Sequence, residues 1–218
     1  MTAAGDLTLD ELQLELAPRI AAAAIFDGWS DLALISASAA AGADPAVARL
    51  AFPGGAMDMI AAWVASIDAQ MEQAFDREVL GQMPIRERIR ALVWFRLEAV
   101  SGLEEALRRA VALQAMPQNL ARTAKLAWSS ADRMWRLAGD TATDYNHYTK
   151  RAILAGVYAA TLAVFIDDAS EGKAETRAFL DRRIEGVMKF EKAKAKWLGQ
   201  REHFDPMRFL GRLRYPAR

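Results

Sequence analysis

The chain has 218 residues, of which 53% are hydrophobic and 26% are charged, and its 28 Lys and Arg residues balance 28 Asp and Glu residues. This length allows one or two domains with a sizeable core, and the hydrophobic content excludes a disordered chain. Because the sequence has no cysteine, it excludes disulfides, thiolate nucleophiles and Cys-ligated zinc or iron–sulfur centres.

The predicted elements are helices throughout. Alanine, a strong helix former, is abundant, β-branched residues are sparse, and no apolar run alternates with a period of two. We expect a first helix over residues 8–26, because Thr8 and Glu11 have the spacing of a capping box. A second helix should begin after Ser30 and end at Gly42. These patterns predict an all-α fold.

A short third helix is expected over residues 44–52 and a longer fourth over 56–80. This layout resembles the N-terminal helix-turn-helix domain of TetR-type regulators. Phosphate contacts require several Lys or Arg, yet Arg49 is the only basic residue between positions 30 and 60. We therefore expect a helix-turn-helix that packs but binds no nucleic acid. The alternative, a TetR-like transcriptional regulator that senses a lipid, would show salt-dependent duplex binding.

The second half predicts a helix over residues 84–115, a break at 116–119 and a further helix ending at Gly139. Residues 152–166 then carry no charge. A membrane span needs roughly 18 consecutive apolar residues, so this shorter run predicts a helix buried on most sides. A last long helix is expected after a turn at 171–173.

Charge is distributed unevenly between the two ends of the chain. Residues 1–80 hold twelve acidic and three basic residues, a net charge of −9. Residues 192–218 hold eight basic and two acidic residues, a net charge of +6. A basic segment with large apolar side chains is typical of a membrane-surface helix, whereas a frayed C-terminus that packs back on the body is the plainer alternative. The expected membrane-binding residues are Trp197, Phe204, Met207, Phe209, Leu210 and Leu213.

Residues that could support catalysis or hold a metal are few. The chain has two histidines, and Asp144 precedes His147 at the spacing of a carboxylate–histidine metal pair on a helix. A di-metal bundle needs a second such pair, which the sequence lacks. No phosphate-binding glycine loop or nucleophile elbow occurs either. We therefore expect no metal, no cofactor and no enzymatic activity.

The chain is rich in large apolar residues, with nine Met, nine Phe and six Trp. These would serve a packed core or line a cavity for a long apolar ligand, and periodicity does not separate the two. The candidates for the lining of a lipid pocket are Trp94, Leu97, Leu154, Tyr158, Leu162 and Phe165.

One stretch carries a family resemblance. Residues 134–158 read M-W-x-x-A-G-D-x-x-T-D-Y-N-x-Y-T-K-R-A-I-L-A-G-V-Y, which closely resembles the signature of the coenzyme Q biosynthesis protein nine family, accessory proteins of ubiquinone synthesis. Residues 170–184, S-x-x-x-x-x-T-R-x-F-L-x-R-R-I, fit the same family, as does G-W-S-D-L-A-L from Gly28. His147 departs from the pattern, because the family commonly has tryptophan there.

The resemblance implies a homodimer with a TetR-like fold that has lost DNA binding. It implies binding of isoprenoid quinone precursors or phospholipid, a C-terminal helix at the membrane surface, and presentation of substrate to a demethoxyubiquinone hydroxylase. The partner surface would comprise Met134, Trp135, Asp140, Thr143, Asp144, Tyr145, Asn146, His147, Tyr148 and Arg151.

We expect three parts: a helix-turn-helix-like unit over residues 1–55, a lipid-binding helical body over 56–191 and a membrane-binding tail over 192–218. The N-terminus has four acidic residues before Arg19 and no basic one, which fits neither a secretory signal nor a transit peptide. On this pattern we expect a bacterial cytoplasmic protein, peripheral on the inner membrane.

Overall fold

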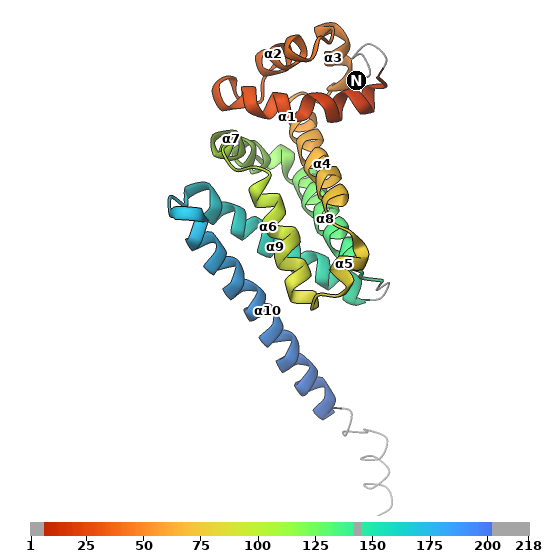
Figure 1. The fold of residues 1–218 in the computed structure, drawn as a ribbon, viewed down its shortest axis with the longest axis vertical. Coiled ribbons are helices and arrows are strands. Elements are labelled where there is room, and N and C mark those ends of the chain that lie inside the picture. The colour runs from red at the N-terminus through yellow and green to blue at the C-terminus, as the bar shows by residue number, and fades with distance from the viewer. Residues whose placement is uncertain (1–6, 142–144, 202–218) are drawn as a thin grey trace, which may run out of the picture.

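The computed structural model describes residues 7–141 and 145–201, with side chains other than those of 145, 146 and 191–201. Over these residues the protein is helical and has no strand, so the predicted all-α class is confirmed. A small N-terminal unit sits on a larger helical body, from which the last helix projects (Figure 1).

The N-terminal unit consists of three helices: α1 (Leu9–Asp27), α2 (Asp31–Ala41) and α3 (Pro45–Ala51). The predicted capping box begins α1, because the Thr8 hydroxyl accepts a hydrogen bond from the Glu11 amide at 3.3 Å and the Glu11 carboxylate accepts one from the Thr8 amide at 2.9 Å. Gly42 ends α2 in the left-handed conformation that glycine adopts without strain. The unit packs on the body chiefly through α1 against α4.

The predicted single helix over 56–80 is wrong, because it is two helices, α4 (Ala56–Ala74) and α5 (Arg77–Gly81). Phe75 is extended, and the Asp76 carboxylate accepts a hydrogen bond from the Glu78 amide at 2.7 Å, which starts a new helix.

The predicted helix over 84–115 is likewise two helices, α6 (Ile85–Glu98) and α7 (Glu104–Gln114). Gly102 lies between them with a φ of +81°, a value that an α-helix does not contain. A 3₁₀ turn, η2 (Pro117–Asn119), then leads into α8 (Leu120–Leu137), so the expected break at 116–119 is confirmed.

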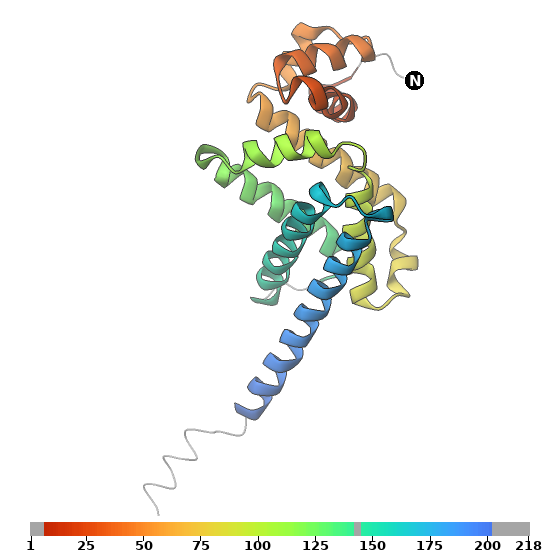
Figure 2. The ribbon, with the colours of Figure 1, turned by 90° about the vertical axis from the view of Figure 1, so that its left-hand side faces the viewer.

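The uncharged run forms part of α9 (Tyr145–Asp167) and is followed by η3 (Glu171–Lys173) and α10 (Ala174–Arg201). The prediction of a helix buried on most sides is wrong. Residues His147–Asp167 are long and apolar enough to cross a membrane, and only 22% of their most apolar window is buried. The neighbouring helices cover one face of α9 and leave the opposite face exposed. The lower half of α10 extends away from the body in both views (Figures 1 and 2).

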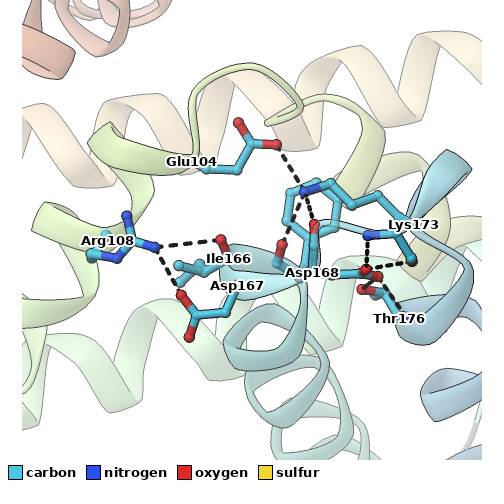
Figure 3. A network of polar contacts seen from close by, with 9 residues as sticks. Glu104, Arg108, Ile166, Asp167, Asp168, Lys173 and Thr176 are labelled. Carbon is cyan, nitrogen blue, oxygen red and sulfur yellow. Dashed lines mark hydrogen bonds and ion pairs between the residues drawn. The ribbon is translucent and has the colours of Figure 1, made fainter.

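The turn between α9 and α10 is held by the network of polar contacts in Figure 3. The Asp168 carboxylate accepts four hydrogen bonds, from the amides and hydroxyls of Ser170 and Thr176, at 2.5–2.9 Å. Lys173 Nζ donates to the carbonyls of Phe165 and Asp168 and pairs with Glu104 of α7 at 3.2 Å. A carboxylate at the start of α10 and an ammonium at the end of α9 both complement the helix dipoles.

Candidate functional site

A buried arginine organises the junction of α8 and α9. The Arg151 side chain is 2% exposed, and its guanidinium contacts Asp132 Oδ1 at 2.5 Å and Asp140 Oδ2 at 3.0 Å. It also donates to the carbonyl of His147 at 3.0 Å. Lys150 gives Asp140 a second cationic partner, at 2.6 Å. The buried guanidinium and the carboxylates of Asp132 and Asp140 are therefore paired with opposite charges, as burial of ionised groups requires.

Beside this junction lies an apolar cavity of about 360 Å³, which we call the motif groove. It is bounded by the start of α6, the end of α8, the first half of α9 and the middle of α10, and Lys150 and Asp140 lie at its polar edge. Its apolar walls include Ile85, Ile89, Trp135, Ile153, Val157 and Ile184.

The rings of Trp128, His147 and Tyr148 lie close together where α8 meets the first turns of α9, and we call them the ring cluster. The ring centroids of Trp128 and Tyr148 are 6.0 Å apart, and that of His147 is 5.1 Å from Tyr148 and 6.4 Å from Trp128. Tyr148 is 62% exposed, so this cluster offers aromatic surface to a partner.

The structure divides the predicted partner residues into two groups. Met134, Arg151 and the Asp140 side chain are buried, so the protein as folded here does not present these three side chains at its surface. The ion pair between Arg151 and Asp140 offsets the cost of burying the two charges. Tyr148 is exposed, and His147 and Trp135 are half-buried. Tyr145 and Asn146 lie in the first turn of α9 with undescribed side chains, and Thr143 and Asp144 lie outside the described residues.

A second cavity, of about 290 Å³, lies between α4, α6, α7, α8 and α9, and we call it the central cavity. Its lining is mostly apolar and includes Ile60, Trp63, Val100, Leu107, Tyr158 and Leu162.

The predicted lipid-pocket residues do not form one site. Leu154 lines the motif groove, whereas Tyr158 and Leu162 line the central cavity. Leu97 and Phe165 are buried in the core and line neither cavity. Trp94 lines a third pocket, of about 320 Å³, between α6 and α10, where the Arg177 guanidinium lies 3.6 Å from its ring centroid.

Sequence reasoning missed a buried ion pair at the central cavity. Arg96 of α6 is 1% exposed and pairs with Asp68 of α4, which is 2% exposed. The Arg96 guanidinium also donates to the Ser130 hydroxyl at 3.0 Å and lies 5.0 Å from the ring centroid of Tyr158. The signal was in the sequence: Arg96 follows Leu92 and Val93 by four and three positions, on the apolar face of its helix.

The other sequence-based predictions concern metal binding and the C-terminal membrane-binding residues. Within the described ranges, no group of three or more His, Asp or Glu side chains is placed to hold a metal ion. Trp197 lies in α10 with an undescribed side chain, and the other expected membrane-binding residues lie outside the described part.

These features define a class of protein: an all-helical chain with a TetR-like fold and two apolar cavities, one of which lies beside residues 135–157. The fold is matched by a TetR transcriptional regulator from Nitrosomonas europaea, with a TM-score of 0.64 and 18% identity over 80% of this chain and 96% of that one. The TetR-like fold predicted from the sequence is confirmed.

Residues 120–191 match the COQ9 family model. The ubiquinone biosynthesis protein COQ9 of Rattus norvegicus is 33% identical over 168 residues, 74% of this chain and 54% of that protein. The Homo sapiens protein is 30% identical over 74% of this chain and 52% of its own length. The chain therefore belongs to the COQ9 family, and it spans about half the length of the curated relatives it matches.

The comparisons support a role in ubiquinone biosynthesis, which the names of these relatives state. They contradict the expected bacterial cytoplasmic location, because the relatives from rat, cattle, human and Drosophila melanogaster are all named as mitochondrial proteins.

Proposed function

We propose that this protein is a non-catalytic, lipid-binding accessory factor of ubiquinone biosynthesis. It binds isoprenoid quinone intermediates or phospholipid and presents the quinone from a membrane surface to a demethoxyubiquinone hydroxylase. The relatives are named as biosynthesis proteins, and those names state no reaction.

The observation that carries this proposal is the motif groove. Its walls come largely from residues 135–188, which lie within the segment that matches the COQ9 family. Volumes of about 360 and 290 Å³ lie at the lower end of the range typical of small-molecule pockets, and such pockets combine apolar walls with few polar groups. An apolar chain would find matching surface in both cavities.

The test is the lipid content of the purified protein. Native mass spectrometry followed by organic extraction should find a bound isoprenoid or phospholipid in about stoichiometric amount. Protein that emerges free of lipid, and takes up none from vesicles, would contradict the proposal.

For the hydroxylase we propose a contact at the ring cluster. Aromatic side chains are enriched at interface hot spots, and Tyr148 is exposed while Trp128 is half-buried beside it. His147 stands in this cluster where the family commonly has tryptophan, so the partner would meet an imidazole at this point.

A homodimer is proposed through the uncovered face of α9. Its exposed positions Ala152, Gly156, Ala159 and Ala163 recur at spacings of four, three and four, which places them on one side of the helix. Small side chains along such a stripe allow a second helix to approach closely.

Changing Gly156 to glutamate should break this dimer while leaving the protomer intact. A Cβ atom at Gly156 meets no heavy atom within 4 Å, so the protomer has room for the side chain. Two like charges facing each other across a two-fold interface should weaken dimerisation at least about tenfold. Sedimentation analysis measures this. Ala112→Glu, on the exposed side of α7, is the control and should remain dimeric.

The segment 192–218 is proposed to bind membrane surfaces through its net charge of +6 and its large apolar side chains. Each basic residue near an anionic surface contributes about 1 kcal/mol. We expect the full chain to float with anionic vesicles in a salt-sensitive manner, and a chain truncated after Glu191 to stay at the bottom of the gradient. Equal flotation of both chains would reject this role.

We propose that the helix-turn-helix unit does not bind nucleic acid. The one basic residue of α3, Arg49, is held by Asp31 in a two-pronged pair at 2.8 and 3.0 Å. This hydrogen bond lowers the pKa of Asp31, so the carboxylate stays ionised and the cation neutralised. Residues 7–80 then offer little positive charge to phosphates.

A further inference from the structure

Arg88 of α6 binds three backbone carbonyls near the ends of α5 and α8. Its Nε donates to the carbonyl of Met83 at 2.8 Å. One terminal nitrogen donates to the carbonyl of Gly81, the last residue of α5, and the other to that of Ala138, directly after α8, both at 2.7 Å. Carbonyls at the C-terminal ends of helices carry partial negative charge, which a guanidinium complements.

The contact with Ala138 completes the end of α8. The last four carbonyls of an α-helix have no partner inside the helix. The amides of Gly139 and Asp140 donate back to two carbonyls of the last turn, at 3.1 and 2.9 Å, in a pattern that commonly ends helices at a glycine. Gly139 has a φ of +90°, and a Cβ atom there would lie 3.3 Å from a terminal nitrogen of Arg88. The guanidinium therefore packs closely against residues 138–140, which we call the Gly139 turn.

The Gly139 turn determines where the Asp140 carboxylate lies. That carboxylate is 5% exposed and pairs with Lys150 at 2.6 Å and with Arg151 at 3.0 Å, both of which belong to α9. The Trp135 indole adds a second connection, because it donates to the carbonyl of Lys150 at 3.0 Å. The first turns of α9, which carry two members of the ring cluster, are therefore attached to the end of α8 by these contacts.

Arg88 itself lines the motif groove, together with Gly139 and Asp140, and is not a member of the ring cluster. We propose that Arg88 is a positioning residue for the ring cluster. By holding the Gly139 turn, it sets the orientation in which α9 presents these rings to the hydroxylase. This inference rests on the proposed hydroxylase contact and adds to it a residue outside the contact that determines its affinity.

The first test measures the affinity of the full chain for the demethoxyubiquinone hydroxylase of the same organism by isothermal titration calorimetry. Arg88→Met keeps much of the apolar side chain but removes all three donors. It should weaken binding about tenfold, the effect of losing about one charge-assisted hydrogen bond. Arg88→Lys keeps a cation beside the helix ends and should show a smaller loss.

Amide hydrogen exchange is a second readout, and it does not depend on the hydroxylase. The Gly139 and Asp140 amides should exchange about tenfold faster in Arg88→Met, because the turn that protects them opens more easily. The amides of α1 should keep their wild-type rates. A general loss of stability would instead accelerate exchange in both places.

Arg109 of α7 provides a matched control, because it makes the same kind of contact at another helix end. Its guanidinium donates to the carbonyl of Phe26, in the last turn of α1, at 3.0 Å. It also lies 3.5 Å from the Cβ position of Gly28, whose φ is +67°. Arg109→Met should leave unchanged both the affinity for the hydroxylase and the exchange of the Gly139 turn.

A double-mutant cycle shows whether Arg88 acts through the rings. Tyr148→Ala removes the most exposed ring of the cluster and should weaken hydroxylase binding without accelerating exchange in the Gly139 turn. Adding Arg88→Met to this variant should then have little further effect, because substitutions that act through one contact are not additive.

Three results would overturn the inference: wild-type affinity in a folded Arg88→Met chain, losses from Arg88→Met and Tyr148→Ala that add in full, or an equal loss in Arg109→Met. Circular dichroism establishes which variants are folded, and Arg88→Lys takes the place of Arg88→Met in these comparisons if the latter is not. A wild-type chain that binds no hydroxylase would remove the proposed contact and the inference with it. A chain that binds the hydroxylase but fails these comparisons would retain the proposed function and lose only the role of Arg88.

Discussion

Replacing Arg151 with methionine should lower the free energy of unfolding by about 3 kcal/mol. Methionine keeps most of the buried volume but leaves Asp132 and Asp140 without the guanidinium they share. Removing one partner of a buried ion pair costs about 3–5 kcal/mol. The lower end applies because Lys150 still pairs with Asp140, and Arg136 with Asp132. Urea denaturation followed by circular dichroism measures the loss.

Arg136→Met is the matched control for this prediction. Arg136 pairs with the same Asp132 at 2.7 Å, but its side chain is 67% exposed. An exposed ion pair contributes at most about 1 kcal/mol, so the loss should be correspondingly small. If both variants lose the same free energy, burial of Arg151 is not what stabilises the junction.

The local elements of this fold were readable from the sequence because short-range chemistry determines them. Thr8, Ser30 and Asp44 begin their helices through side chains that accept amide hydrogen bonds two or three residues ahead. The breaks at Asp76 and Gly102 were missed, although both carry a recognisable signal, a capping carboxylate and a glycine. At both positions, apolar residues continue at helical spacing on either side of the break, so the periodicity predicted one uninterrupted helix.

The candidate site was less predictable, because it depends on contacts between distant helices. The motif was found by resemblance, but the roles of its polar residues follow from pairing. From the sequence alone, Arg151 and Asp140 were predicted to contact a partner. The structure shows instead that Arg151 is buried between Asp140 and Asp132 of α8. The same holds for Arg96, whose partner Asp68 lies on α4. Periodicity places both on buried faces but does not identify the partner.

The exposure of α9 shows a further limit of sequence reasoning. Its uncharged run predicts burial, and within the protomer only one face is buried. The absence of charge in a helix does not say whether its own chain covers it, because that depends on how distant helices pack. The small residues around Gly156 on the uncovered face are the basis of the dimer proposed above.

Replacing Asp168 with alanine should lower the free energy of unfolding at pH 7 by about 3 kcal/mol. The carboxylate accepts four hydrogen bonds from Ser170 and Thr176, and the variant leaves the buried Thr176 amide and hydroxyl without that acceptor. Ser170→Ala removes one of the four hydrogen bonds and should cost about 1 kcal/mol. Thermal and urea denaturation of the wild type, Asp168→Ala and Ser170→Ala should rank their free energies of unfolding in the order wild type, Ser170→Ala, Asp168→Ala.

The pH dependence provides an independent check of this role. Burial opposes ionisation of Asp168, but the hydrogen bonds from Ser170 and Thr176 outweigh it and hold its pKa well below the usual range. A depressed folded-state pKa contributes stability that is complete above the unfolded value of about 3.9 and is lost as the pH falls below it. The difference between wild type and Asp168→Ala should therefore be constant from pH 5 to 7, about one pH unit and more above that value, and shrink in stronger acid. A constant difference across the acid range would mean that the carboxylate charge is not what joins α9 to α10, and the direction in which α10 leaves the body would need another cause.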